Sequence, residues 1–330
     1  MSASLPDPSR RPRWAHLLAQ NIGLELSVFL LVACVLGYCG AFYAQQQRFP
    51  GGFEVTSTVN NTMPLVLAGM AQTLVVLTRG IDLSVGGIID LTNATAAITL
   101  GDSPGSMVLW SAVVLLIGAA CGLVNGLLVG LGRLQPILVT LATLSIYQGV
   151  AIRVLPQPGG QVPEVYTAVL ANTSGPWSLL YVVALGVLWT GFRRTRLGVA
   201  VFAIGNDPQA AQANGIAARR VVILAYVLGG VLSAAAGLFL AASATAGDAT
   251  TGNGFTLTSI VAVVLGGVSL FGGRGSAVGA IMGAFVINMI VNILFFAHID
   301  PLYQAFYEGM FLVVAVLAAN GIGRLARVRR

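Results

Sequence analysis

The side chains that could do chemistry in this chain are few, and they form no catalytic motif. The sequence has no HExxH or GxSxG motif and no paired His and carboxylate cluster, so it lacks the catalytic residues that a membrane hydrolase needs. All 17 basic residues are Arg, and none is Lys. Because a Walker A loop needs a Lys on the β- and γ-phosphates, the chain cannot hydrolyse ATP by that route. We therefore predict no catalytic residue, no metal site and no cofactor bound by this chain.

The acidic side chains Asp82 and Asp90 lie at the start of an apolar run and inside it. Asp82 and Ser84 belong to Ile-Asp-Leu-Ser-Val-Gly-Gly at 81–87. An Asp at a helix start can cap free backbone N–H groups; the alternative is a pivot between two half-helices beside a transport pathway. A charged Asp at the centre of a membrane helix costs about 2.5–3.5 kcal/mol, so Asp90 should face protein or water. It forms either the wall of a polar cavity or a buried contact with another helix.

Neutral polar side chains recur inside the apolar segments and are further candidates for a pathway. A small polar solute would be held weakly through several hydrogen bonds, whereas Asn and Gln inside helices also join helices to one another. The residues alone leave both interpretations open. With Asp90, the candidates are Gln72, Asn93, Asn125, Thr140, Thr143, Ser145, Gln148, Asn288 and Asn292.

The composition places these residues in a membrane. Of the 330 residues, 56% are hydrophobic and only 8% are charged, and the mean hydropathy is +0.87. A soluble domain carries about 25% charged residues, so the composition excludes a soluble enzyme, a disordered tail and a collagen-like rod.

The apolar segments predict an all-α, polytopic integral membrane protein with about ten transmembrane helices. A single transmembrane domain would cover 24–319, between cytoplasmic tails at 1–23 and 320–330. The segments 83–101 and 257–271 are either continuous or broken helices. The predicted spans are 24–44, 60–78, 83–101, 107–131, 136–154, 177–192, 221–244, 257–271, 275–297 and 302–319.

The distribution of Arg predicts the orientation. With the N-terminus in the cytoplasm and ten spans, only Arg48 and Arg153 of the 17 Arg face outward. Because cytoplasmic loops carry the excess of basic residues, both termini should be cytoplasmic. The basic sequence pI near 9.7 is then a sign of orientation, and no nucleic-acid partner is expected.

Glycine recurs every four residues in the fourth predicted span, at Gly118, Gly122, Gly126 and Gly130. Small residues on one face let helix backbones approach closely in lipid. The stripe indicates packing within the chain or, alternatively, an interface between subunits.

The cytoplasmic loop 193–220 is bracketed by Arg and contains a short predicted helix. Asn206 or Asp207 can cap this helix, Pro208 suits its first turn, and Gly215 ends it. A short capped helix on the cytoplasmic face is typical of a docking element.

Four stretches resemble the membrane subunit of bacterial ABC importers for monosaccharides, the ribose/xylose/galactose-type permease family. They keep the order and spacing of that family between about residues 60 and 320. The stretches are RGIDLSVGG at 79–87, TLATLSIYQGVA at 140–151, AIGNDPQAAQANGI at 203–216 and LTSIVAVVLGGVSLFGGRGSAVGAIMGA at 257–284.

The resemblance implies roles for two groups of residues. Those expected to couple to the ATPase are Asn206, Asp207, Pro208, Ala210, Ala211, Asn214, Gly215 and Ile216. Those of the family signatures, expected at a pivot, are Asp82, Ser84, Gly86, Gly266, Gly267, Gly272, Gly273, Arg274 and Gly275.

The chain departs from the family pattern at three places. Arg79 stands where Gly is commoner, Thr258 and Ser259 stand where Asp and an Ile-Ala-Ala run are usual, and Asn292 is followed by Ile293 rather than by Asn-Gly. These departures leave the substrate open, whereas the family resemblance remains.

The resemblance also implies partners and a mechanism. The partners are a second permease subunit, identical or paralogous, a cytoplasmic ATPase subunit that binds ATP and Mg, a periplasmic substrate-binding protein and the lipid of a bacterial inner membrane. Transport would proceed by alternating access. The sugar, the gate residues and the choice between homodimer and heterodimer stay open.

Two other function classes compete with this interpretation. An ion-coupled secondary transporter of a small polar solute would use Asp90 or Glu308, with Glu25 near an inner end. A membrane-embedded enzyme or assembly scaffold would carry no solute.

Overall fold

A computed structural model describes residues 13–172, 174–175, 177–300, 303, 306–307, 309–310 and 313, and their side chains from residue 24 on, residue 26 excepted. Twelve named helices and an isolated bridge between Gly159 and Gly247 make up the regular structure of this part of the chain. The helices are α1 (Arg13–Gln46), α2 (Gly52–Leu77), α3 (Val85–Thr99), α4 (Pro104–Gly130), α5 (Pro136–Val154), α6 (Glu164–Leu170), α7 (Ser178–Phe192), α8 (Arg196–Asn206), α9 (Pro208–Ala213), α10 (Ala218–Ala244), α11 (Asn253–Leu265) and α12 (Ala277–Phe296).

The all-α prediction is confirmed, but the described residues hold fewer full spans than the ten expected. Six helices are long and apolar enough to cross a membrane: those at 27–46, 52–77, 104–130, 136–154, 218–244 and 277–296. The predicted span 302–319 falls mostly outside the described residues, as does the tail 320–330. α1 begins at Arg13, within the predicted tail 1–23, whose cytoplasmic location stays a prediction.

Three predicted spans are short helices. The segment 83–101 forms α3 with 15 residues, 257–271 forms α11 with 13 residues, and 177–192 forms α7 with 15 residues. At 1.5 Å per residue, α3 is about 22 Å long, whereas the hydrocarbon core is about 30 Å thick. The rest of the segment 257–271 is a glycine-rich loop, because α11 ends at Leu265. Each short helix is continuous and shorter than that thickness.

The first turns of α3 and α11 meet inside the protein. A Cβ atom on Gly86 would lie 2.6 Å from the Gly252 carbonyl oxygen, so only glycine allows this approach. The loop 245–252 reaches that point by running along α3. Gly247 packs on Ala97 near the end of α3, and Gly252 packs on Gly86 near its start.

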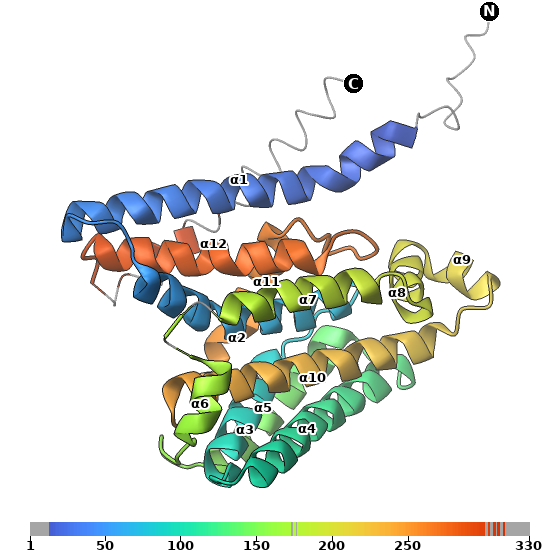
Figure 1. Cartoon of the computed structure of the whole chain (residues 1–330). Helices are drawn as coiled ribbons and strands as arrows, with labels where there is room; N and C mark the ends of the chain where they lie inside the picture. Colours follow the sequence, from blue (N-terminus) through green and yellow to red (C-terminus); the bar gives the residue numbers. More distant parts are fainter. Residues whose placement is uncertain are drawn as a thin grey trace, which may run out of the picture.

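The glycine stripe of α4 packs against α10 within the chain. A Cβ atom on Gly122 would lie 2.9 Å from the Tyr226 carbonyl carbon, and one on Gly126 would lie 2.9 Å from Ile223 Cα. The two helices run side by side in Figure 1. The prediction of packing within the chain is therefore confirmed for this face, which leaves it no room for a second subunit.

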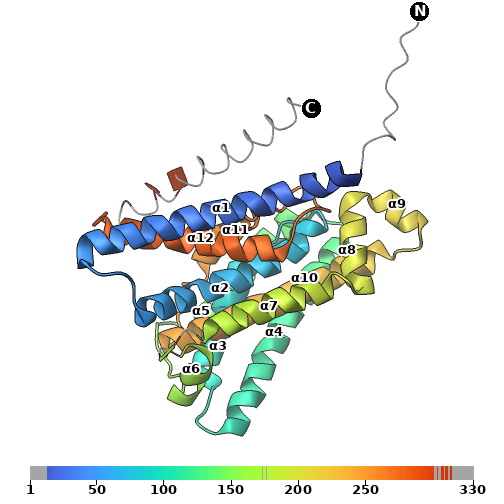
Figure 2. The same ribbon diagram turned by 45° about the horizontal axis from the view of Figure 1, so that its top comes forward.

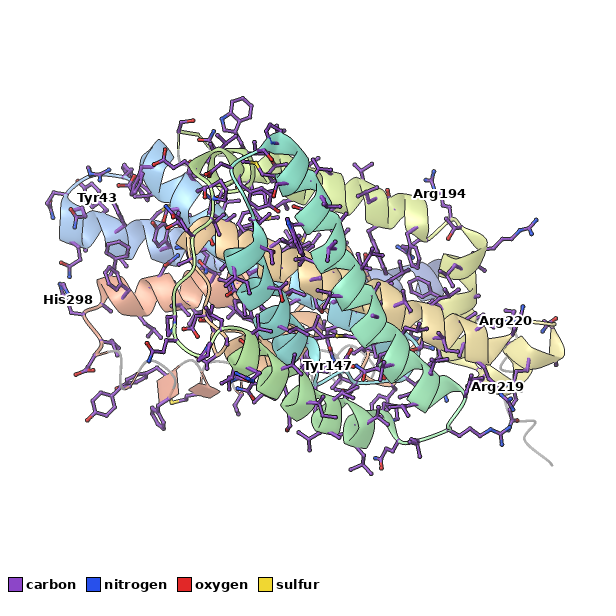
Figure 3. The ribbon with its side chains drawn as sticks, turned by 90° about the horizontal axis from the view of Figure 1, so that it is seen from below. Tyr43, Tyr147, Arg194, Arg219, Arg220 and His298 are labelled. Atoms are coloured by element: carbon purple, nitrogen blue, oxygen red, sulfur yellow. The ribbon has the colours of Figure 1, made fainter. Side chains whose placement is uncertain are left out.

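The long helices α1, α10 and α12 run in roughly the same direction, so the molecule has two ends, whereas α6 is steeply inclined to them (Figure 1). α1 and α12 form one side, while α3, α4 and α5 form the other, with α2 and α10 between them. Figure 3 places Arg194, Arg219 and Arg220 at one end and Tyr43 and His298 at the other. α8 and α9 stand at the Arg-rich end, where α9 projects from the bundle (Figure 2).

Candidate functional site

Asp82 organises a buried polar network at the turn between α2 and α3. Its carboxylate accepts hydrogen bonds from the Ser84 backbone N at 2.8 Å and from Ser84 Oγ at 2.6 Å. Asn125 on α4 donates from Nδ2 to Ser84 Oγ at 2.7 Å. Asp82, Ser84 and Asn125 are all at most 1% exposed. Since Ser84 is itself the residue before α3, Asp82 binds the turn that precedes the helix and does not cap an N–H inside it.

Two further helices hold the same turn. Gln72 on α2 pairs with the Asp82 backbone when its amide is oriented so that Nε2 donates to the carbonyl oxygen at 2.9 Å. Thr140 on α5 accepts a hydrogen bond from the Leu83 backbone N at 3.0 Å. Tyr147, one further turn beyond Thr143 on the buried side of α5, donates to the Cys121 carbonyl oxygen at 2.9 Å. Hydrogen bonds thus tie the turn to α2, α4 and α5. Tyr147 joins α5 to α4, and no sequence signal indicated this role.

Asp90 joins the short helices α3 and α11. Its Oδ1 accepts a hydrogen bond from the Gly252 backbone N at 2.5 Å, directly before α11. Asn93, one turn further along α3, accepts from the Asp248 backbone N at 2.7 Å. A carboxylate near a helix N-terminus is favourable because the N–H groups there carry partial positive charge. Of the two interpretations of Asp90, the geometry is that of a buried contact with another helix.

Two polar atoms at this junction have no hydrogen-bond partner among the described residues. They are Asp90 Oδ2 and Thr256 Oγ1, and both are buried. Thr256 lies on the first turn of α11, against Gly86. Thr256 was not among the predicted site residues, because a lone Thr near a helix start carries no distinctive pattern.

The glycine-rich signature at 266–275 forms the loop between α11 and α12. Gly267, Gly272, Gly273 and Gly275 all adopt positive φ angles, between 69° and 128°, which favour glycine. Gly266 ends α11 and leaves no room for a Cβ atom beside Gly279 of α12. The Ser269 backbone N donates to the Arg274 carbonyl oxygen at 2.9 Å, which closes the loop on itself. The signature glycines are therefore needed for the shape of this loop.

The short helix predicted in the inner loop is present as α9. Asp207 caps it, since its Oδ1 accepts from the backbone N of Gln209 at 2.9 Å and of Ala210 at 3.0 Å. Gly215 follows with φ +81°, and Ala211 is the only buried residue of α9. Asn206, the other candidate cap, instead donates to the Gly273 carbonyl oxygen at 3.0 Å. Most of the surface of α9 is therefore exposed, and its coupling role stays a prediction.

The predicted pathway residues do not gather around one open cavity. Gln72, Asn125, Thr140 and Thr143 are buried at or beside the network around Asp82, and Asp90 and Asn93 are buried at the α3–α11 junction. The others lie nearer the surface and apart from these groups: Gln148, Asn288 and Asn292 are half-buried and Ser145 is exposed. Their role in a pathway stays a prediction.

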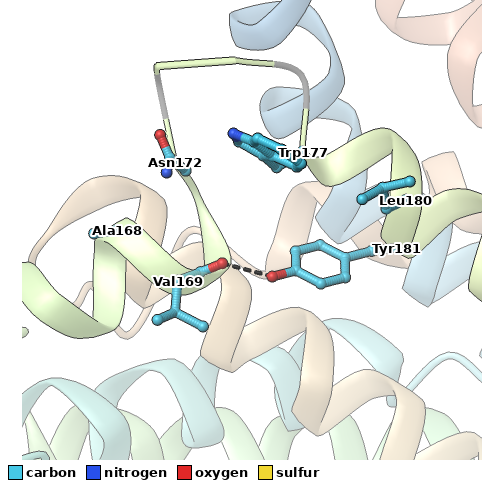
Figure 4. Close-up of a pocket in the computed structure, with 6 residues that line it drawn as sticks. All are labelled: Ala168, Val169, Asn172, Trp177, Leu180 and Tyr181. Carbon is cyan, nitrogen blue, oxygen red and sulfur yellow. Dashed lines mark hydrogen bonds between the residues drawn. The ribbon is translucent and has the colours of Figure 1, made fainter.

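A small surface pocket lies between α6 and α7 (Figure 4), and α6 lies at the end opposite α9 (Figure 1). Tyr181 donates from its hydroxyl to the Val169 carbonyl oxygen at 2.6 Å across it, and Trp177 lines it beside Asn172. Aromatic side chains are enriched at membrane interfaces. None of the predicted pathway residues lines this pocket.

Residues 55–316 match the family described as branched-chain amino acid transport system / permease component. The chain is 33% identical over 285 residues to the ribose import permease protein RbsC of Escherichia coli (strain K12), covering 82% of this chain and 88% of that protein.

Two further relatives are similar over comparable lengths. The ribose import permease protein RbsC of Haemophilus influenzae is 31% identical, covering 83% of this chain and 88% of that protein. The autoinducer 2 import system permease protein LsrC of Yersinia pseudotuberculosis (serotype O:3) is 32% identical, covering 92% of this chain and 86% of that protein. No solved structure matches the chain significantly.

Proposed function

The chain belongs to the family of branched-chain amino acid transport system permease components, and from this premise we propose that it is the membrane subunit of an ATP-binding-cassette importer for a monosaccharide or a similar small polyol-like solute. It is a multi-pass protein of a bacterial inner membrane and is itself no enzyme. The relatives that support a sugar-like solute are import permeases for ribose and for autoinducer 2, similar along most of their length.

The structural observation that carries the proposal is the exposed helix α9. It stands at the Arg-rich end of the molecule, is capped by Asp207, and keeps only Ala211 buried. Such a helix is suited to dock on an ATPase subunit in the cytoplasm, where ATP and Mg would be bound. The absence of any Lys from the sequence supports the division of labour, because a Walker A loop requires one.

The same geometry suggests which parts move during alternating access. Short helices that end inside the membrane commonly mark the moving and binding parts of transporters. α3 and α11 are such helices, and Asp90 joins their first turns. A periplasmic binding protein would deliver the solute at the end that carries α6, and closure of the ATPases would act at the opposite end through α9.

A second permease subunit, identical or paralogous, would complete the pathway. α5 packs one side against α3, whereas Ser145 is exposed and Gln148 is half-buried. Polar groups on an otherwise apolar exposed face suit a water-filled path between two subunits better than lipid.

The proposal is tested by purifying the tagged chain in mild detergent from native membranes and assaying ATP hydrolysis and co-purifying subunits. Recovery of an ATPase subunit is the expected result, and reconstituted uptake should require ATP. Uptake that follows an ion gradient without ATP would contradict the proposal and favour an ion-coupled transporter.

The docking role of α9 is tested in the same assay by Asp207→Arg and by deletion of 206–214. Both should uncouple ATP hydrolysis from uptake, because they remove the cap or the helix itself. Asp207→Asn is the matched control, since Asn is as good an N-cap as Asp and should keep uptake close to that of the unaltered chain. Normal ATP-driven uptake by the deletion variant would refute the role of α9.

A further inference from the structure

Arg79 holds an unusual backbone conformation at the cytoplasmic end of α2. α2 ends at Leu77, and two residues later Arg79 has φ +68°. A non-glycine residue in this left-handed region is strained. Glycine would hold this backbone conformation without strain, so what Arg adds at this position is its side chain.

The guanidinium group of Arg79 donates two hydrogen bonds to the last turn of α8. Nε donates to the Gly205 carbonyl oxygen at 2.8 Å, and Nη2 donates to the Asn206 carbonyl oxygen at 2.7 Å. Carbonyl groups at a helix C-terminus carry partial negative charge, so a cation is favourable there. Two donors in the planar group also fix its direction. Asn206 directly precedes Asp207, the N-cap of α9. The hydrogen bonds of Arg79 therefore lie at the start of the projecting helix.

A third segment closes the contact. The Gly273 backbone N donates to the Leu77 carbonyl oxygen at 3.1 Å, and Asn206 Nδ2 donates to the Gly273 carbonyl oxygen at 3.0 Å. A Cβ atom on Gly272 would lie 2.6 Å from Arg79 Cγ. Three segments therefore pack closely around Arg79: the end of α2, the end of α8 and the α11–α12 loop.

We propose that Arg79 is a positioning residue that transmits movement of α9 to the turn between α2 and α3. This inference rests on the proposed docking of an ATPase on α9. A displacement of α9 acts first on the end of α8, which the guanidinium holds. Arg79 lies three residues before Asp82, whose network anchors the start of α3. α9 is thus connected to α3 through the Arg79 side chain and the turn between α2 and α3.

The test compares Arg79→Gly with Arg133→Gly in the importer complex reconstituted into vesicles. Gly accepts the left-handed backbone at both sites, so neither substitution should strain the fold. Arg133 is the matched control: it also has a positive φ, +54°, lies on the predicted cytoplasmic side, and has no side-chain hydrogen bond within the described residues. ATP hydrolysis and uptake of radiolabelled ribose, the probe suggested by the relatives, are measured together.

We expect Arg79→Gly to keep ATP hydrolysis while solute taken up per ATP hydrolysed falls about fivefold or more, the scale of a typical coupling between sites. Arg133→Gly should keep the ratio of the unaltered complex. A merely structural role would lower both activities together and leave the ratio unchanged. An equal ratio in the two variants would overturn the inference while the proposed function stands.

Further measurements distinguish a failure of the inference from a failure of the proposed function. If Arg79→Gly does not accumulate, Arg79→Gln is measured in the same way, since it removes the charge and the paired donors but keeps a side chain; an unchanged ratio there overturns the inference. If the unaltered complex neither hydrolyses ATP nor takes up any of a panel of labelled monosaccharides, the proposed function fails instead.

Discussion

Several buried polar side chains of this membrane protein bind backbone groups of other segments. Asp90 binds the N–H of Gly252, Asn93 binds the N–H of Asp248, and Thr140 binds the N–H of Leu83. Inside lipid an unsatisfied backbone group costs several kcal/mol, so each irregular turn within the membrane needs such an acceptor. The polar residues that the sequence marks as pathway candidates therefore have a structural task as well.

At the residue scale, Asp90→Asn should keep uptake and Asp90→Leu should lose it. The amide oxygen of Asn can still accept from the Gly252 backbone N, whereas Leu leaves that buried N–H unpaired, at about 1–3 kcal/mol. We expect the Leu variant to melt at a lower temperature in detergent. Both variants are compared with the unaltered chain in ATP-driven uptake and in thermal unfolding.

The same pair of variants separates two transport mechanisms. A carboxylate that carried a coupling ion could not be replaced by an amide. A well-folded Asp90→Asn variant without uptake would therefore contradict a structural role for Asp90 and favour the ion-coupled transporter.

At the scale of elements, close helix packing depends on the absence of side chains at particular positions. Gly122 of α4 faces the backbone of Tyr226 on α10, whereas Gly186 of α7 has open space where a Cβ atom would stand. Both glycines lie inside helices, so the same substitution should have opposite effects at the two sites.

Gly122→Ala should destabilise the protein, and Gly186→Ala should not. Overpacking costs about 1–3 kcal/mol, while Ala in an open helical site gains up to about 1 kcal/mol over Gly. Thermal unfolding of the two purified variants measures the difference. A Gly122→Ala variant as stable as Gly186→Ala would mean that α4 and α10 are not in direct backbone contact.

For the whole molecule, the ends of the helix bundle should face opposite sides of the membrane. Gln209 on α9 lies at the Arg-rich end, and Gln157 precedes α6 at the other end; both are exposed. We expect a membrane-impermeant maleimide to label Gln157→Cys in intact spheroplasts and to label Gln209→Cys only after permeabilisation, in a chain whose Cys34, Cys39 and Cys121 are replaced by Ala. The positive-inside rule gives the reason. Labelling of Gln209→Cys from outside would reverse the topology.

Local patterns alone predicted several elements closely. The span 136–154 coincides with α5, and α9 follows from Asp207, Pro208 and Gly215, which lie within nine residues of one another. The glycine repeat of α4 likewise indicated a packing face, although its partner α10 could not be read from it. The sequence left open whether 83–101 and 257–271 are continuous or broken helices, because apolar composition does not reveal where a buried turn replaces helix.

The sequence by itself determined the membrane environment, the helical class, the family and the capped helix α9, because composition, helix periodicity and capping depend on residues close together in the chain. Only the tertiary structure decided that α3 meets α11, that Asp90 binds a backbone 162 residues away and that Arg79 reaches a helix end 126 residues away. These contacts join segments whose separation along the chain is unrelated to their distance in space. Their hydrogen bonds form only once packing has brought the backbones together, so no local pattern encodes them.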